Sequence, residues 1–128
     1  DQFKRVNDAY GHDAGDRVLK VFADILRSNT RSSDISGRIG GEEFLHVITH
    51  AEETHMPMVV ERTRARLHGH PFVFDGTVVT VSASFGVAGF DSSEPVPAFS
   101  ELIARADRAL YRAKQLGRNR IEFEPLAT

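Results

Sequence analysis

The chain has 128 residues, 41% of them hydrophobic, a length and composition typical of one globular domain with a buried core. Its formal net charge is −2, from 16 basic and 18 acidic residues, so no broad surface for a nucleic-acid polymer or an anionic membrane is expected. The absence of cysteine excludes disulfide frameworks and thiolate metal sites, and no apolar run is long enough to predict a membrane segment.

The first 30 residues are predicted to form two helices. A short helix is expected over residues 3–10, ending at Gly11, with a turn over residues 12–15. A second helix is predicted from Asp16 to the polar segment 28–30, because apolar residues recur at helical spacing. These residues are Val18, Leu19, Phe22, Ile25 and Leu26.

Two adjacent glycines separate two hydrophobic runs, which predicts a β-hairpin with arms over residues 34–39 and 42–48. A two-residue turn of this kind needs positive φ, so the turn is expected at Gly40-Gly41, where glycine adopts that conformation without steric cost. Adjacent side chains on a strand point to opposite faces, so Glu42 and Glu43 are not expected to decorate one solvated surface. One of them is therefore expected to serve a function at the hairpin tip.

A third helix and a second hairpin are predicted in the middle of the chain. The helix is expected to begin between Glu52 and Pro57 and to end at His68, because Pro is tolerated in a first turn. Two strands, 72–74 and 77–87, are expected on either side of an Asp-Gly turn.

The last third of the chain is predicted to contain a helix and a strand. The helix is expected over residues 101–116, with Ser100 as its N-cap and Gly117 just past its end. The strand is expected over residues 120–124. Two hairpins mixed with long helices predict an α+β sandwich, in which helices cover one or both faces of a largely antiparallel sheet.

Four blocks of this sequence, in order and at matching spacing, resemble the signature of the GGDEF domains, the diguanylate cyclases. The resemblance covers essentially the whole chain and implies a palm-like α+β fold, similar to nucleotidyl cyclases and ferredoxin-like sandwiches, with a central mostly antiparallel sheet flanked by helices. It also implies condensation of two GTP molecules into cyclic di-3′,5′-GMP with loss of pyrophosphate. The blocks are FKxxNDxxGHxxGD at residues 3–16, RxxD at 31–34, RxGGEEF at 38–44 and DxALYxAKxxGRN at 107–119.

The resemblance assigns catalytic roles to three residues around the first hairpin. Glu42 is implied as the ligand of Mg²⁺ or Mn²⁺, which fits the preference of Mg²⁺ for carboxylates together with substrate phosphates. Glu43 is implied as a group that assists deprotonation of the 3′-hydroxyl or holds metal-bound water, and Arg38 as a group that reaches the developing charge. The structural alternative is that these acids are solvated turn residues or structural acids.

The guanine contacts implied by the resemblance fall on Asn7 and Asp16. An amide and a carboxylate together match the donors and acceptors of a base edge, and the carboxylate suits donors of guanine that adenine lacks. From the residues alone, Asn7 is interpreted as a helix terminator and Asp16 as an N-cap or first-turn acid, which are the commoner roles of such residues.

The phosphate contacts implied by the resemblance come from two segments. Backbone amides near Gln2, Phe3 and Lys4 are expected to surround the terminal phosphates. Lys114 and Arg118 match phosphate-binding positions, lie four residues apart, and therefore share one side of a helix, with Arg118 past the final turn. A basic last turn also complements the helix dipole, which is the structural alternative.

An inhibitory site for cyclic di-GMP is implied by the RxxD block. Arg31 and Asp34 match its two named positions, and Arg62 is expected to be an additional arginine of that site. Guanidinium groups pair bidentately with phosphate, and a carboxylate accepts hydrogen bonds from guanine. Without the neighbouring blocks, an RxxD sequence marks only a polar turn, and Arg62 is an exposed residue on a solvated face.

One expected metal ligand lies outside the sequence. In the family, the first strand supplies an Asp two residues before the position of Asp1, so residues 1–128 are expected to be a GGDEF domain truncated within that strand. Such a fragment is expected to be a poor catalyst that still folds and binds cyclic di-GMP. A version extended upstream is then expected to turn over GTP faster, and equal turnover by both would contradict this.

The resemblance also implies partners and a location. Each domain holds one GTP, so catalysis requires a two-fold homodimer, controlled by an upstream sensory domain absent from this chain. The location implied is the bacterial cytoplasm, alone or as the cytoplasmic part of a larger or membrane-anchored protein. Three alternatives stay open: a cyclic di-GMP receptor without catalysis, a related cyclase or polymerase palm for another nucleotide, and a regulatory ferredoxin-like module.

Overall fold

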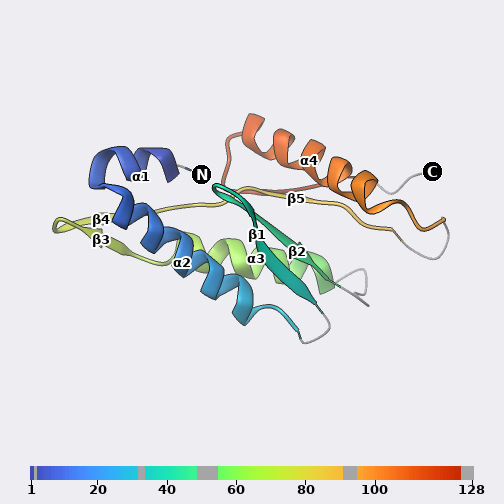
Figure 1. Ribbon diagram of the computed structural model, residues 1–128, viewed down its shortest axis with the longest axis horizontal. Helices are drawn as coiled ribbons and strands as arrows, with labels where there is room; N and C mark the ends of the chain where they lie inside the picture. The colour runs from blue at the N-terminus through green and yellow to red at the C-terminus, as the bar shows by residue number, and fades with distance from the viewer. Residues whose placement is uncertain (2, 32–33, 49–54, 91–94, 125–128) are drawn as a thin grey trace. The chain divides into compact units, whose positions relative to one another are not determined.

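The computed structural model describes residues 1, 3–31, 34–48, 55–90 and 95–124 (Figure 1). The chain packs as two compact units, Asp1–Ser82 and Ala83–Thr128, and each is described by itself. The first unit contains α1 (Phe3–Tyr10), α2 (His12–Ser28), β1 (Ile35–Gly40), β2 (Glu43–Val47), α3 (His55–His68), β3 (Phe72–Phe74) and β4 (Thr77–Val79). The second unit contains β5 (Phe85–Val87), α4 (Phe99–Gln115) and β6 (Ile121–Phe123).

Helices α1 and α2 are separated by a single residue. Gly11 has a φ of 93°, a left-handed conformation that ends α1 as predicted. The turn predicted over residues 12–15 is wrong, because α2 begins at once at His12. Gly15 lies inside this helix, where a side chain would collide with Asn7 of α1. The glycine that resembled a turn signal therefore leaves room for the Asn7 side chain of the neighbouring helix.

The β1–β2 hairpin is confirmed, but its turn differs from the expected one. The turn residues are Gly41 and Glu42, and Gly40 pairs with Glu43 at the end of the ladder. Neither Gly40 nor Gly41 has the positive φ that was predicted. A register shift between Arg38 and Gly40 adds one residue to β1, and this bulge changes the path of the chain into the turn.

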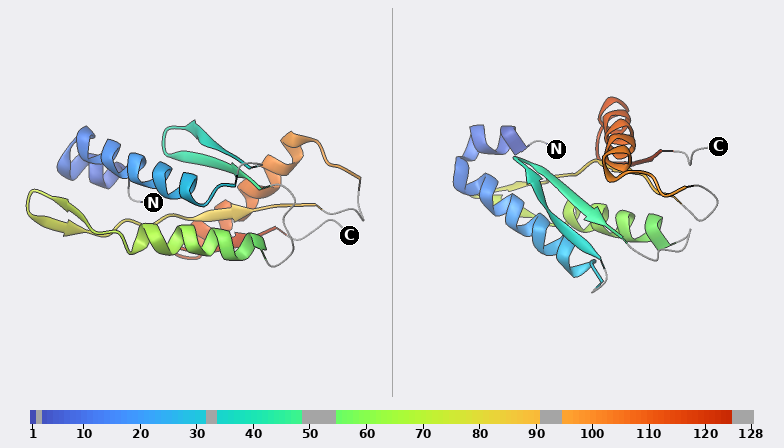
Figure 2. Two further views of the ribbon diagram at one scale, coloured as in Figure 1. Left: turned by 90° about the horizontal axis from the view of Figure 1, so that it is seen from below. Right: turned by 45° about the vertical axis from the view of Figure 1, so that its right-hand side comes forward.

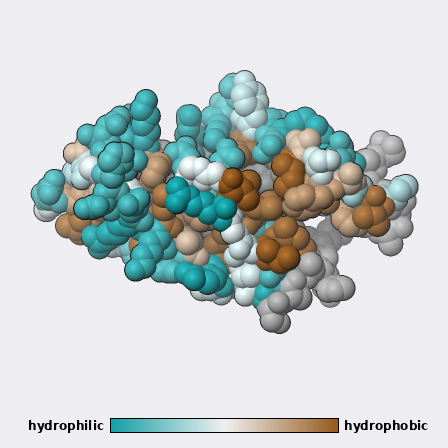
Figure 3. Space-filling model, in the orientation of Figure 1, coloured by the Kyte–Doolittle hydropathy of each residue, from teal (hydrophilic) through white to brown (hydrophobic). Residues whose placement is uncertain are grey.

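The hairpin packs against α2, which is visible in both views of Figure 2. The rings of Phe22 and Phe44 meet edge to face, with centroids 4.9 Å apart. Helix α3 also packs on α2, where the Asn29 amide donates a hydrogen bond of 2.8 Å to the Thr63 hydroxyl. The face of α2 seen in Figure 3 is largely hydrophilic. Of the predicted apolar stripe, Val18 and Leu26 are buried, whereas Leu19, Phe22 and Ile25 are half-buried.

The β3–β4 hairpin is confirmed with the predicted Asp-Gly turn. Asp75 and Gly76 have φ values of 51° and 78°, the two positive φ values that a two-residue hairpin turn requires. The long strand predicted over residues 77–87 is interrupted, because β4 ends at Val79 and β5 begins at Phe85. Only the first part pairs with β3.

The second unit is a parallel pair of strands joined by a helix. β5 and β6 pair in parallel, with Phe85 opposite Ile121, and α4 forms the crossover that a parallel pair needs. Helix α4 begins at Phe99 with Ala98 as its N-cap, so the predicted cap at Ser100 is wrong. Its C-terminal end is confirmed, because Gly117 has a φ of 121° and the Arg118 amide donates to the Ala113 carbonyl oxygen.

The α+β class is confirmed. The described strands form three two-stranded ladders, of which β1–β2 and β3–β4 are antiparallel and β5–β6 is parallel. None of the helices in the described residues has the length and apolar character needed to cross a lipid bilayer.

Candidate functional site

The turn of the β1–β2 hairpin presents two carboxylates to solvent. Glu42 is a turn residue, Glu43 is the first residue of β2, and both are exposed. No ion pair or hydrogen bond ties either carboxylate to another group among the described residues. Arg38 holds the turn in place, because its Nε donates a hydrogen bond of 2.8 Å to the Gly41 carbonyl oxygen and its Nη2 binds the same oxygen.

The two glycines of this hairpin are not required by the fold of the described chain. A Cβ atom built on Gly40 or Gly41 would meet no atom within 4 Å, and neither residue has a positive φ. Without side chains at these two positions, the backbone of the turn is left uncovered. The turn is therefore open to a ligand that contacts the backbone beside Glu42.

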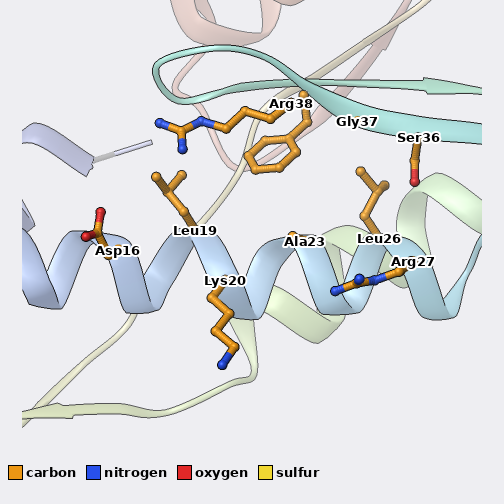
Figure 4. Close-up of a pocket in the computed structure, with 10 residues that line it drawn as sticks. Asp16, Leu19, Lys20, Ala23, Leu26, Arg27, Ser36, Gly37 and Arg38 are labelled. Carbon is orange, nitrogen blue, oxygen red and sulfur yellow. The ribbon is translucent and has the colours of Figure 1, made fainter.

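An open groove of about 590 Å³ runs between α2 and the β1–β2 hairpin (Figure 4). Asp16 and Leu19 of α2 lie toward one end of it, and the Arg38 side chain extends from β1 over Leu19. The remaining lining residues are Lys20, Ala23, Leu26, Arg27, Ser36, Gly37 and Phe44. The structure thus brings Asp16 and Arg38, predicted from separate sequence blocks, to one groove.

Asn7 has a buried polar atom without a partner. Its Oδ1 forms no hydrogen bond within the part of the chain that the structure describes. The side chain packs against Gly15, where an added Cβ would lie 1.8 Å from Oδ1 and 3.0 Å from the Phe3 ring. A buried amide oxygen without a partner costs free energy, so this atom is suited to accept a hydrogen bond from a ligand. Lys4, the other residue predicted in this segment, is exposed, and Gln2 lies outside the described residues.

Lys114 and Arg118 belong to the second unit. Lys114 lies in the last turn of α4, and Arg118 follows the helix in a left-handed conformation with a φ of 62°. Neighbouring arginines of α4 pair with carboxylates: Arg112 Nη1 lies 2.8 Å from Glu124, and Arg108 Nε lies 3.3 Å from it. No such pair is found for Lys114 or Arg118 among the described residues, so both cations remain available to an anion.

The RxxD residues form a compact turn before β1. The Asp34 side chain is 1% exposed, and its Oδ2 accepts a hydrogen bond of 3.1 Å from the Arg31 amide. Arg31 Nε lies 3.5 Å from the same oxygen, and the guanidinium side chain is 45% exposed. Asp34 therefore orients an exposed arginine, while Ser32 and Ser33 lie outside the described residues.

Arg62 lies on α3 and is exposed. Its Nε donates a hydrogen bond of 2.9 Å to Oδ1 of Asn29, at the end of α2. This contact fixes the direction of a cation that the sequence placed only on a helix. The three residues predicted for the inhibitory site thus all lie in the first unit.

Comparisons with known proteins identify the family. Residues 1–120 match the family model described as diguanylate cyclase, GGDEF domain. The chain belongs to the GGDEF family. It is 43% identical over 122 residues to diguanylate cyclase DgcP of Pseudomonas aeruginosa, covering 95% of this chain and 18% of that protein. Two further curated relatives are covered over 32% and 26% of their length, so the chain spans a minor part of each of these diguanylate cyclases.

Solved structures show the same fold. The GGDEF domain of DgcB from Caulobacter crescentus, in complex with c-di-GMP, matches with a TM-score of 0.89 and 27% identity, covering 97% of this chain and 72% of that one. The active GGEEF domain of a diguanylate cyclase from Vibrio cholerae matches with a TM-score of 0.84 and 32% identity, covering 99% and 79%. The predicted palm-like fold is thereby confirmed.

The exposed carboxylates of the β1–β2 turn are the candidate metal ligands of this GGDEF domain. No group of three or more His, Cys, Asp or Glu side chains suited to a metal ion occurs in the described part of the chain. The donors that are present fit Mg²⁺, because Glu42 and Glu43 are exposed carboxylates and Mg²⁺ is bound by one or two carboxylates together with substrate phosphates.

Sequence reasoning missed two kinds of site residue. Leu19 and Phe44 line the groove, although periodicity assigned Leu19 only to the core. Asn29 was interpreted only as part of the polar end of α2, yet it is 6% exposed and binds α3. A buried asparagine at a helix end has a sequence signal only as a cap, so its partners across the fold could not be found.

His46 of β2 is a half-buried histidine close to Asp34 and Thr30. Burial lowers the pKa of His46, and the nearby Asp34 carboxylate partly opposes this. The Thr30 hydroxyl donates its proton to the Leu26 carbonyl oxygen, so His46 Nε2, 3.3 Å away, must be the donor to Thr30. The folded state therefore favours the neutral ring.

We expect the free energy of unfolding to fall as the pH drops below about 6.5, the ordinary pKa of histidine, toward the lower folded-state pKa. Above pH 6.5 the contribution is fully present, because both states hold a neutral ring. Urea unfolding between pH 7.5 and 5.5 measures this, and His46→Gln should flatten the dependence. His12→Gln is the control, since His12 is exposed; equal slopes in the two variants would contradict the assignment.

Proposed function

We propose that this GGDEF domain condenses two GTP molecules into cyclic di-3′,5′-GMP and releases two pyrophosphates. The observation that carries the proposal is the β1–β2 turn, where Glu42 and Glu43 are exposed and have no partner among the described residues, beside glycines whose Cβ positions are empty. The same five residues, GGEEF, give the active GGEEF domain of the Vibrio cholerae diguanylate cyclase its name. This supports activity with Glu in the middle of the motif.

The reaction needs positioning and charge neutralisation more than covalent catalysis. Each 3′-oxygen forms a bond to the α-phosphorus of the other GTP, the bond to pyrophosphate breaks, and the hydroxyl proton leaves to a base. We assign Glu42 to hold Mg²⁺ or Mn²⁺, which when bound neutralises phosphate charge, and Glu43 to accept the proton directly or through water. Two copies of the domain must face each other, because each holds one GTP.

Hydrogen-bond acceptors are assigned to the guanine base of the substrate, and N–H donors and cations are assigned to its phosphates. The orphaned Asn7 oxygen accepts a hydrogen bond from a donor on the guanine edge, and the Asp16 carboxylate takes a second donor. Phosphate is bound by the backbone amides at Phe3 and Lys4 and by the cations of Lys114 and Arg118. Arg38 has a separate role, because it fixes the turn that carries Glu42.

In this proposal cyclic di-GMP binds at a second site and thereby inhibits its own formation. The guanidinium groups of Arg31 and Arg62 are both exposed and each is held by a neighbouring polar side chain. Phosphate and guanine edges are ligands that such groups bind bidentately. An upstream sensory domain and a cytoplasmic location belong to the same proposal.

Incubation of the protein with GTP and Mg²⁺, followed by nucleotide chromatography, tests the activity. We expect cyclic di-GMP and pyrophosphate in a ratio of one to two, and no product from ATP. A domain that binds cyclic di-GMP without making it is the second candidate, favoured by the preformed Arg31–Asp34 turn. Binding of cyclic di-GMP without turnover would select that receptor function and reject catalysis.

Gly15→Ala is expected to weaken GTP binding while α2 remains folded. The added methyl group would lie 1.8 Å from Asn7 Oδ1, so the amide must move away from its present position. Because this contact is to a side-chain end, rotation relieves it at small cost in stability. We expect KM for GTP to rise roughly tenfold with a smaller change in kcat. Gly89→Ala, where a Cβ meets no atom within 4 Å and which does not line the groove, is the control; equal KM values would argue against the role of Asn7.

A further inference from the structure

Asn29 joins two arginines of α3 to the end of α2. Its Oδ1 accepts hydrogen bonds from Arg62 Nε at 2.9 Å and from Arg66 Nη1 at 3.2 Å. Its amide nitrogen donates to the Thr63 hydroxyl at 2.8 Å, so every polar atom of this buried side chain is used. Arg66 Nη1 also donates to the Ser28 hydroxyl at 3.1 Å. The amide therefore fixes the direction of two guanidinium groups at once.

These two guanidinium groups are held together without a negative charge. Arg62 and Arg66 are four residues apart on α3, where like charges repel. The nearest acid along the helix, Glu61, is taken by Arg64, whose Nε and Nη2 lie 2.9 and 2.6 Å from its carboxylate oxygens. Neither Arg62 nor Arg66 forms an ion pair among the described residues. An anion would relieve this repulsion.

The N–H groups of Arg62 and Arg66 that make no hydrogen bond within the described residues are suited to bind a phosphodiester. A guanidinium group has five N–H donors, and Arg62 uses only its Nε within the described structure. Both arginines are exposed, so their remaining N–H groups are accessible to a ligand. Two adjacent planar donors bind the two free oxygens of a phosphodiester better than one does.

We propose that Arg66 is a second phosphate-binding arginine beside Arg62 and that Asn29 is the residue that positions both. The ligand is the phosphodiester of a cyclic dinucleotide, so this inference rests on the proposed inhibitory site. Asn29 sets the spacing of the two cations through one shared acceptor, and Arg64 takes no part because Glu61 neutralises it.

Calorimetric titration of the chain with cyclic di-GMP tests the role of Arg66. Arg66→Gln is expected to raise Kd roughly tenfold, since one charged hydrogen-bonding group is lost. Arg64→Gln, which removes the same charge from the same helix, is the matched control and should stay within about twofold. Equal Kd values for these two variants would overturn the role of Arg66. A complete lack of binding by the unsubstituted chain would instead reject the inhibitory site itself.

The variant Asn29→Asp tests whether Asn29 positions Arg62 and Arg66 for the ligand or only stabilises the fold. This substitution keeps the shape and the acceptor oxygen and loses the amide donor to Thr63. It also places a negative charge against both arginines, where it competes with the phosphate and strengthens the two hydrogen bonds that offset the lost one. We expect Kd to rise at least roughly fivefold while the midpoint of thermal unfolding does not fall. An unchanged Kd would show that Asn29 does not control the site.

Discussion

Glu42→Gln is expected to lower kcat for cyclic di-GMP formation at least about a thousandfold. Glutamine keeps the size of the side chain but removes the negative charge that suits a divalent cation at this turn. Stability should not change, because Glu42 is exposed and has no protein partner within the described chain. The measurement is initial rate by nucleotide chromatography, together with thermal unfolding of the same preparation.

Asp75→Asn is the matched control for this prediction. Asp75 is also an exposed acid in a two-residue hairpin turn, and Asn tolerates its left-handed φ of 51°. The control variant should keep normal turnover. A Glu42→Gln protein as active as the Asp75→Asn protein would rule out Glu42 as the metal ligand.

Gly86→Ala is expected to destabilise the second unit by about 3 kcal/mol or more. A Cβ on Gly86 would lie 2.1 Å from the Ala106 carbonyl oxygen and 2.3 Å from the Leu110 amide nitrogen, both backbone atoms of α4. A side chain can rotate away from such a contact, but a helix backbone cannot. The methyl group would therefore force α4 off β5, the strand it covers.

Urea unfolding followed by circular dichroism measures this effect. Gly89→Ala is the control in the same unit, since a Cβ there meets no atom within 4 Å and its φ is not positive. The control should lose a small fraction of the stability that Gly86→Ala loses. Matching midpoints for the two variants would contradict the close packing of α4 on β5.

Several elements of this domain could be predicted because their cause is local. The buried stripe of α2 follows from a 3.6-residue period, and the β3–β4 turn follows from an Asp-Gly pair that accepts two positive φ values. The end of α4 follows from Gly117, whose φ of 121° suits glycine. In each case the residues that decide the local structure lie close to one another in the sequence.

Other elements depended on residues far away in the sequence. Gly15 resembles a turn residue, but it lies within a helix because Asn7 occupies the space of its missing side chain. Residues 77–87 form one alternating run of apolar and polar residues in the sequence, which predicted a single strand. In the structure this run contains two strands, because β4 pairs with β3 whereas β5 pairs with β6. The alternation of apolar and polar residues predicts a strand, but it does not predict which other strand that strand pairs with.

The sequence by itself determined the family of this protein and its α+β class, because ordered motifs and local periodicity are written in neighbouring residues. Only the tertiary structure decided three other matters: that Asn7 Oδ1 is buried without a partner among the described residues, that Gly40 and Gly41 have empty Cβ positions, and that Asn29 holds two arginines. The physical reason is that burial and hydrogen-bond satisfaction are set by atoms from other elements, whose approach no local pattern specifies.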